Sequence, residues 1–275
     1  MSTRLASRFA SLKREGRAGL VAYVMASDPD HETCFEILRG LPAAGADVIE
    51  LGFPFTDPMA DGASIQKAAL RALKAGGSLR QTLALAKRFR ETNADTPLIL
   101  MGYANPIEQM GYAAFASTTR AAGADGAIVV DLPPEEDGPL RAAFAASGLS
   151  IIRLATPTTD ANRLTKVLEG ASGFLYYVSV AGVTGANAAT SSAVRAAVER
   201  LRSATDLPIA VGFGVREPEA ARAIALTADA VVVGSAFVDE IAAGPAPQAA
   251  DRVLHKVAQL SEAVRSARAL EGTPA

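Results

Sequence analysis

Short apolar segments typical of buried strands recur eight times along this chain of 275 residues. They are apolar on both faces and rich in β-branched residues, as expected for parallel strands covered on both sides rather than for half-exposed antiparallel strands. Alanine-rich stretches with helical spacing separate them. This alternation predicts an α/β fold, a (β/α)₈ or TIM barrel. The expected strands are residues 20–25, 47–52, 97–102, 125–131, 149–154, 174–179, 208–213 and 229–234.

Length and composition favour a single domain, residues 1–275, with a sizeable core: 49% of the residues are hydrophobic and 20% are charged. The formal net charge of −2 and the lack of a basic run argue against a nucleic-acid partner. No leader or membrane-length apolar run stands out, and the single cysteine, Cys34, has no second cysteine for an internal disulfide. These features favour a cytoplasmic protein with no membrane partner.

Two additions to the barrel are expected. The stretch from Thr3 to Arg14 has a helical pattern and is placed to plug the barrel floor. A long loop, residues 53–62, follows the second strand; it is rich in proline, aspartate and glycine, and two further helical segments come after it. Active sites of this fold are built from βα loops at the top face, so we expect this extended loop to carry function.

A related phrase precedes three of the strands. Ala-Ala-Gly-Ala-Asp occurs at 43–47 and at 121–125, and Thr-Ala-Asp at 227–229. The glycine is suited to end a helix in left-handed geometry, and the aspartate opens the next strand. The phrase therefore predicts αβ turns at the stability face of the barrel, without a chemical role.

Glycines end the last two strands, in Val-Gly-Phe-Gly at 211–214 and Val-Gly-Ser at 233–235. Backbone N–H groups at these two strand ends commonly form the phosphate-binding site of a (β/α)₈ barrel, helped by the dipole of the helix after Ser235. The ligand is therefore expected to be a phosphate ester. The alternative is that both glycine sites only make tight turns.

Glu50 lies near the end of the second apolar strand, in Val-Ile-Glu-Leu-Gly at 48–52. Burying a carboxylate there costs on the order of several kcal/mol unless it is paired or protonated, so its pKa should be raised. An acid whose pKa lies near neutrality is suited to donate a proton to carbon. The alternative is that Glu50 pairs with a buried arginine or amide.

Asp61 lies in the long loop after the second strand, where it is placed to add a second carboxylate above the strand ends. Two carboxylates in unlike surroundings suggest two catalytic roles. The alternative for Asp61 is that it only caps the helix beginning near Ala63.

Other reactive side chains are poorly placed for catalysis. His31 follows a helix start and His255 lies in the C-terminal helix, so they form neither a metal cluster nor a nucleophile–histidine pair. The six lysines all lie in helical stretches, which disfavours a Schiff base at the barrel mouth. Cys34 lies among apolar neighbours and is expected to be a buried thiol. Carboxylates, hydroxyls and backbone groups remain for the chemistry.

The sixth βα loop, residues 180–187, is small, polar and contains two glycines. It is long enough to fold over a ligand as a lid, with Thr184 supplying a hydroxyl; the alternative is a solvent loop without function. Tyr176 lies in the sixth strand, and periodicity leaves open whether it packs in the core or presents a catalytic hydroxyl.

The stretch from Ile49 to Gly62, Ile-Glu-Leu-Gly-Phe-Pro-Phe-Thr-Asp-Pro-Met-Ala-Asp-Gly, resembles the signature of the tryptophan synthase alpha chain family. Matching segments at 101–106, 131–136, 179–185, 211–215 and 233–236 extend the resemblance over nearly the whole chain. Members of this family are (β/α)₈ barrels that cleave indole-3-glycerol phosphate to indole and D-glyceraldehyde 3-phosphate in L-tryptophan biosynthesis. The resemblance implies a carbon–carbon lyase that uses neither a metal nor a Schiff base.

The resemblance also implies roles for single residues. Glu50 matches the family's general acid, Asp61 the aspartate that accepts the indole N–H, and Tyr176 an active-site tyrosine. The positions that match the apolar wall around indole are Tyr23, Met101, Ile128 and Leu154. Those that match the lid and the phosphate site are Thr184, Gly185, Phe213, Gly214, Gly234 and Ser235. The chain departs from the family at Ser27, where glycine is common, and at Val180, which is arginine in some members.

A beta chain is the partner that the resemblance implies, in an alpha2-beta2 heterotetramer, with pyridoxal phosphate bound only by the beta chain and no cofactor in this one. Two other functions remain open: a stand-alone lyase that releases indole, and a non-catalytic subunit that senses the phosphate ester and activates a partner. Intact carboxylates argue against the sensor. The proline-rich stretch 53–58 and Asn105-Pro106 resemble the family's docking surface and argue against the stand-alone enzyme.

Overall fold

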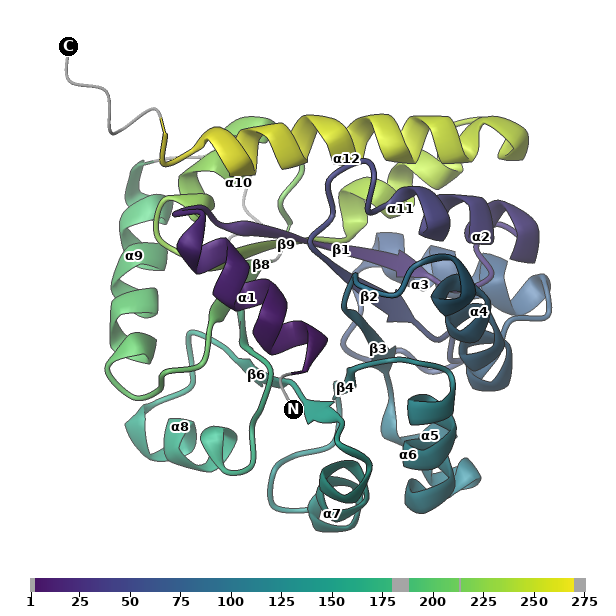
Figure 1. Ribbon diagram of the computed structural model, residues 1–275, viewed down its shortest axis with the longest axis horizontal. Coiled ribbons are helices and arrows are strands. Elements are labelled where there is room, and N and C mark those ends of the chain that lie inside the picture. The colour runs from purple at the N-terminus through teal and green to yellow at the C-terminus, as the bar shows by residue number, and fades with distance from the viewer. Residues whose placement is uncertain (1–2, 180–187, 213, 270–275) are drawn as a thin grey trace.

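The computed structural model describes residues 3–179, 188–212 and 214–269. Strands and helices alternate along them, which confirms the predicted (β/α)₈ barrel (Figure 1). The strands are β1 (Gly19–Met25), β2 (Val48–Gly52), β3 (Leu98–Gly102), β4 (Gly126–Val129), β5 (Ser150–Ile151), β6 (Arg153–Ala155), β7 (Leu175–Val178), β8 (Ile209–Gly212) and β9 (Ala230–Val233). None of the described helices has the length and apolar character needed to cross a membrane.

Helices surround the barrel, and α12 packs against α2, α10 and α11 on one side of it (Figure 1). The α-helices are α1 (Arg4–Arg14), α2 (His31–Gly40), α3 (Ala63–Lys74), α4 (Leu79–Thr92), α5 (Ala104–Met110), α6 (Tyr112–Ala121), α7 (Gly138–Ser147), α8 (Ala161–Leu168), α9 (Ala188–Arg202), α10 (Pro218–Ala225), α11 (Ser235–Ala242) and α12 (Ala249–Ser266), with a short 3₁₀ helix, η1 (Ala246–Gln248). The two segments expected after the second strand are α3 and α4.

The sheet has the order β5-β4-β3-β2-β1-β9-β8-β7-β6, and each of the pairs is parallel. Its two outer strands, β5 and β6, are the halves of the single fifth strand expected at residues 149–154. The strand is divided at Ile152: its first half pairs with β4 and its second half with β7. The barrel therefore closes at Ile152, where the chain passes directly from β5 to β6, and not through a continuous ladder of paired strands.

Side chains alternate between the inside of the barrel and the surrounding helices because successive strand residues point to opposite faces. Val21, Val48 and Ile99 point inward and form one core with Leu5 and Phe9 of α1. The helix thus covers the amino-terminal end of the barrel, as predicted for the N-terminal stretch, and Figure 1 shows it (purple) lying across the strands. Outward-facing residues form a larger core with the outer helices.

The three aspartates of the αβ turns have a common role at the amino-terminal end of the barrel. Each accepts a hydrogen bond from the backbone of the neighbouring strand and pairs with an arginine, so it joins two strands at their starting points. The contacts are Asp47 with the Leu20 N–H (3.0 Å) and Arg17 (2.9 Å), Asp125 with the Leu98 N–H (2.9 Å) and Arg4 (2.8 Å), and Asp229 with the Ile209 N–H (2.8 Å) and Arg202 (3.0 Å).

Backbone conformation explains two features of the sequence. Gly45 and Gly123, in the repeated turn phrase, have positive φ values of 107° and 77°; Gly123 directly follows the C-cap residue of α6 as predicted, whereas Gly45 lies in a turn five residues after the end of α2. Ser27, where glycine is common in the family that the sequence resembles, also has a positive φ of 69°. A serine in this region carries a conformational cost that glycine avoids.

Candidate active site

A cavity of about 640 Å³ opens at the carboxyl end of the barrel strands. Its walls come from the ends of several strands, from the loop before α3 and the first residues of α3, and from the start of α11. The long loop after β2 therefore reaches the top face, where the sequence predicted it to act. Both predicted carboxylates, Glu50 and Asp61, line this one cavity.

Glu50 is positioned by β2, in register with Tyr23 of β1. Its side chain points into the barrel and is only 1% exposed. The Oε1 atom has no hydrogen-bond partner among the described residues. Burial is the cause that raises the pKa of Glu50 to about 8, so the acid is largely protonated at neutral pH. No arginine or amide of the described residues neutralises it, and the alternative of a structural pair is not supported.

Asp61 is half-buried at the rim of the same cavity. Burial raises its pKa to about 6, and the Tyr103 hydroxyl acts in the opposite direction by stabilising the charged form. The same hydroxyl accepts a hydrogen bond from the Ala60 N–H at 3.1 Å, so Tyr103 holds the end of the loop. The N-cap of α3 is Gly62, without a side-chain cap. Asp61 therefore does not cap α3, and the alternative of a purely capping role is not supported.

The two carboxylates differ in ionisation near neutral pH because their surroundings differ. Glu50 lies among apolar barrel residues, whereas Asp61 lies near the surface beside a hydroxyl. Tyr23 is close to both: burial raises the pKa of its hydroxyl, and the charges of Asp61 and Glu50 raise it further. A protonated acid and an ionised acid can therefore face one ligand, as general acid catalysis with a second stabilising carboxylate requires.

Two glycines make room for the tyrosine hydroxyls in the cavity. A Cβ atom at Gly52 would lie 2.3 Å from the Tyr23 hydroxyl, and one at Gly212 would lie 3.1 Å from the Tyr176 hydroxyl. Tyr176 lines the cavity, which settles the orientation that its periodicity left open. Burial and the neighbouring Glu50 charge raise the pKa of Tyr176, so its hydroxyl stays neutral and can donate a hydrogen bond.

The glycine-rich strand ends lie at one side of the cavity. Gly214, with a positive φ of 73°, lines it together with Gly234 and Ser235. Gly234 is the N-cap of α11 and has no side-chain cap, so the first N–H groups of α11 remain available to an anion. This arrangement fits the predicted phosphate site. Phe213 lies outside the described residues, as do Thr184, Gly185 and the rest of the predicted lid at 180–187.

The predicted apolar wall is placed in part as expected. Tyr23, Met101 and Leu154 line the cavity, but Ile128 is fully buried in the barrel interior below it and does not. The corresponding wall position is taken by Val130, two residues further along and just past the end of β4, because residues on one face of an extended segment share a spacing of two.

Sequence reasoning missed several other lining residues. They are Val130, Thr156, Val178, Val232, Ser64, Ile65 and Arg216. For the valines the signal was present, since each lies two positions beyond an inward-facing residue. Tyr103 does not line the cavity, but it holds the loop of Asp61, and this role was missed too. Arg216 has no such signal, because it belongs to the loop after β8.

The side chains that were expected to be poorly placed for catalysis lie away from the cavity. Cys34 is buried on α2, and burial raises the pKa of its thiol to about 12, which leaves it unreactive. The six lysines lie on helices, as predicted. In the described part of the chain, no group of three His, Cys, Asp or Glu side chains is arranged to hold a metal ion.

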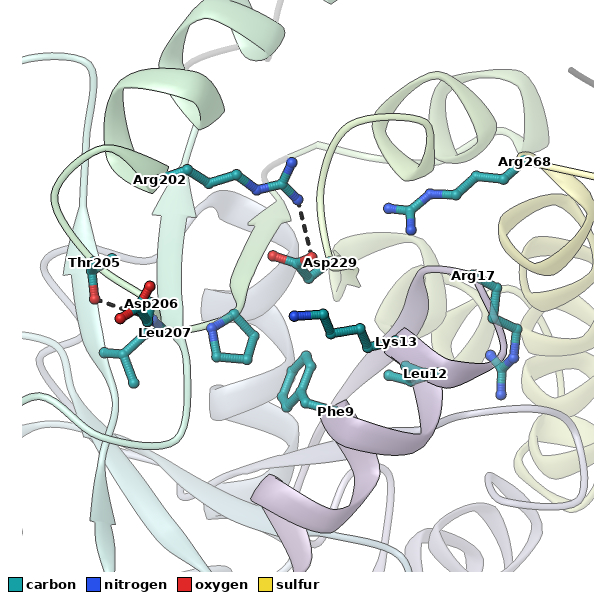
Figure 2. Close-up of a pocket in the computed structure, with 11 residues that line it drawn as sticks. Phe9, Leu12, Lys13, Arg17, Arg202, Thr205, Asp206, Leu207, Asp229 and Arg268 are labelled. Atoms are coloured by element: carbon teal, nitrogen blue, oxygen red, sulfur yellow. Dashed lines mark hydrogen bonds and ion pairs between the residues drawn. The ribbon is translucent and has the colours of Figure 1, made fainter.

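A second cavity, of about 470 Å³, lies at the opposite end of the barrel between α1, α9 and α12 (Figure 2). Charged side chains line it, but Asp229 is already paired: Arg202 donates a hydrogen bond to it at 3.0 Å. Arg268 is engaged as well, with the carbonyls of Ala225 and Ala228. This cavity lacks the unpaired buried acid that distinguishes the upper one.

Comparisons with known proteins agree with the site. The family model for the tryptophan synthase alpha chain matches residues 9–269. A tryptophan synthase alpha chain of Caulobacter sp. (strain K31) is 57% identical over 267 residues, covering 96% of this chain and 97% of the relative.

Solved structures give the same result. The alpha subunit from Legionella pneumophila str. Paris has a TM-score of 0.89 at 38% identity, with 96% of this chain and 99% of that chain covered. A tryptophan synthase structure from Mycobacterium tuberculosis has a TM-score of 0.87 at 34% identity, with the same coverage of 96% and 99%. The chain therefore belongs to the tryptophan synthase alpha chain family and is a lyase.

Proposed function

We propose that the chain cleaves indole-3-glycerol phosphate to indole and D-glyceraldehyde 3-phosphate, with Glu50 as general acid and base. The observation that carries this proposal is the buried, unpaired Glu50 that shares one cavity with Asp61 and with a free helix N-terminus. Protonating carbon requires an acid that still holds its proton near neutral pH, and the pKa of about 8 meets this requirement.

The reaction follows from the two ionisation states. The Glu50 carboxyl group donates its proton to indole C3, and the Asp61 carboxylate accepts a hydrogen bond from the indole N–H, which stabilises the positive charge that develops on the ring. The Glu50 carboxylate then takes the proton of the substrate hydroxyl next to the ring. The aldehyde forms, the carbon–carbon bond breaks, and its electron pair restores the aromatic ring.

The remaining groups bind and orient the substrate. Tyr23, Met101 and Leu154 provide an apolar surface for the bicyclic ring. Gly214, Gly234 and Ser235 offer backbone N–H groups and a hydroxyl to the phosphate. Tyr176, adjacent to Glu50, contributes a neutral hydroxyl to the reacting end of the substrate.

The partner we propose is a beta chain, in an alpha2-beta2 heterotetramer in the cytoplasm, with pyridoxal phosphate held by the beta chain alone. Membership of the tryptophan synthase alpha chain family and the similarity to tryptophan synthase from Mycobacterium tuberculosis support a complex of this kind. We also propose that residues 1–275 act as a single domain, since one barrel contains the described strands.

Glu50→Gln tests the function. The substitution keeps the shape of the side chain but removes the transferable proton, so kcat should fall at least roughly 100-fold, whereas phosphate binding should be retained. Indole release from indole-3-glycerol phosphate is measured with and without a beta chain, and Glu262→Gln on the exposed face of α12 is the control.

Near-normal turnover by Glu50→Gln would contradict the assignment. Activation of the beta chain without indole release by the wild-type chain would favour the sensor. Indole release without formation of a complex would favour the stand-alone lyase.

A further inference from the structure

Arg216 is a cation in the active-site cavity to which neither the sequence nor the proposed function assigns a role. It lies in the connection between β8 and α10 and lines the cavity together with Gly214, Gly234 and Ser235. The other charged side chains among the described lining residues are the carboxylates Glu50 and Asp61. Arg216 is thus the one positive side chain that the described part of the lining offers to a phosphate dianion.

The present partner of Arg216 is Asp239 on α11. The Nη1 atom donates to Oδ2 at 2.6 Å, and the two side chains are 49% and 41% exposed. An exposed ion pair of this kind contributes only about 0–1 kcal/mol. Releasing Arg216 from Asp239 therefore costs little compared with what a phosphate dianion offers a guanidinium.

The position of Asp239 places the guanidinium close to the phosphate site. Asp239 follows Ser235, the first residue of α11, by about one helical turn, which is roughly 6 Å along the helix axis. A change of rotamer in the long arginine side chain covers this distance. The guanidinium is therefore held one turn away from the N–H groups that face the cavity.

We propose that Arg216 is a further substrate-binding residue, which leaves Asp239 and binds the phosphate of the substrate when that phosphate occupies the N-terminus of α11. The inference rests on the proposed function for the identity of the phosphate ester. A helix N-terminus carries only about half a positive charge, which does not balance a dianion in a cavity that already holds two carboxyl groups. The planar guanidinium adds a full charge and two parallel N–H donors that match phosphate oxygens.

Asp239 has a defined part in this arrangement. In the empty site it competes with the ligand for Arg216 and keeps the guanidinium near the cavity mouth. Removing the Asp239 charge should therefore tighten phosphate binding, whereas removing Arg216 should weaken it. This opposite pair of effects distinguishes a binding role from a merely structural ion pair, since loss of a structural pair would act alike from either side.

Binding of inorganic phosphate to the full chain, measured by titration calorimetry, tests the proposal without need of turnover. We expect Arg216→Gln to raise the dissociation constant for phosphate about 10-fold, as for loss of a charge-assisted hydrogen bond. Arg216→Lys should recover part of the lost affinity. Asp239→Asn should tighten binding roughly 2- to 3-fold. Arg88→Gln, which breaks a similarly exposed pair with Glu32 far from the cavity, should leave it unchanged.

Steady-state kinetics add a second measurement. For indole-3-glycerol phosphate, Arg216→Gln should raise KM about as much as it weakens phosphate binding, while kcat stays within about 2-fold, because ground-state binding alone is lost. Unchanged phosphate affinity in Arg216→Gln would overturn the inference, as would equal weakening in Arg88→Gln. If the wild-type chain released no indole but Arg216→Gln still lost phosphate affinity, the proposed function would fail and the binding role would stand.

Discussion

Glu50, near the carboxyl end of the barrel, and the turn aspartates Asp47 and Asp125, at its amino-terminal end, have opposite surroundings. At the amino-terminal end, Asp47 and Asp125 are buried, but each accepts a backbone N–H and pairs with arginine. At the carboxyl end, Glu50 is buried as deeply, and none of the described arginines or lysines pairs with it. The first arrangement joins neighbouring strands through hydrogen bonds and ion pairs; the second raises the pKa of Glu50 and makes it suited to supply a proton. All three acids are buried, so burial does not distinguish the structural acids from the proposed catalytic one. The presence or absence of an arginine partner does.

The two cavities repeat this difference. The lower one has a volume of about 470 Å³, not far below the upper one at about 640 Å³, and it is lined by more cationic side chains. Asp229, just before β9, however, is bound by an arginine and by the backbone. Size and charge alone would not identify the active site, whereas an unpaired buried acid does.

The largest effect is expected at the paired end. Asp47→Asn keeps the shape of the side chain but removes the buried carboxylate that Arg17 and Arg8 share and leaves Arg17 only its exposed partner Glu15, so the free energy of unfolding should fall by about 3–5 kcal/mol. Urea unfolding measures it. Glu15→Gln, which removes the exposed partner of the same Arg17, should cost less than about 1 kcal/mol. A small loss in Asp47→Asn would mean that the two ends do not differ in this way.

Substitution of Glu50, at the carboxyl end, should increase the free energy of unfolding, whereas substitution of Asp47 should decrease it. Because folding raises the pKa of Glu50 from 4.5 to about 8, the native state binds the proton more tightly, and stability is lost as the pH rises from 4.5 to 8. Glu50→Gln removes this loss and should stabilise the protein above about pH 8 by on the order of a few kcal/mol, with little gain near pH 4. Unfolding curves at both pH values measure the gain. A gain that does not depend on pH would contradict the raised pKa.

The smallest effect concerns Tyr103. The rate constant kcat/KM should fall below about pH 6, where Asp61 becomes protonated, and above about pH 8, where Glu50 loses its proton. Tyr103→Phe removes a hydroxyl that lowers the pKa of Asp61, so the acid limb should move to higher pH. At about pH 6 we expect kcat/KM to fall roughly 2- to 10-fold.

The partly buried Tyr112 provides the control, since its hydroxyl contacts Glu108 rather than a cavity residue. Tyr112→Phe should leave the pH profile unchanged. An acid limb that stays in place in Tyr103→Phe would show that this hydroxyl does not set the ionisation of Asp61.

Much of the fold and the main acid were predictable because they depend on local pattern. The strand at 48–52 is apolar on both sides of Glu50, and this alone predicted the raised pKa that the structure confirms. The turn phrases were recognised as turns, but the strand-joining role of Asp47 was not, because its partners Leu20 and Arg17 lie far away in the sequence.

Other features depend on which layer of the barrel a residue occupies. Ile128 was expected at the apolar wall, yet Val130 occupies it, since the spacing of two gives the face of a strand but not the height of the cavity floor. The division of the fifth strand at Ile152 was also beyond prediction. Its first half pairs with β4 and its second half with β7, which no local pattern in the sequence indicates.

That division makes one part of the barrel wall unlike the rest. Beyond Ile128, β4 has no ladder with β6 on its far side, because the sheet order leaves β5 and β6 at its two ends. Val130 and Leu154 flank this seam at the edge of the cavity. The Ile152 N–H donates to the Ala127 carbonyl at 3.0 Å, so the wall is joined just below this seam, and above it the rim of the cavity is shaped by side-chain packing rather than by strand pairing.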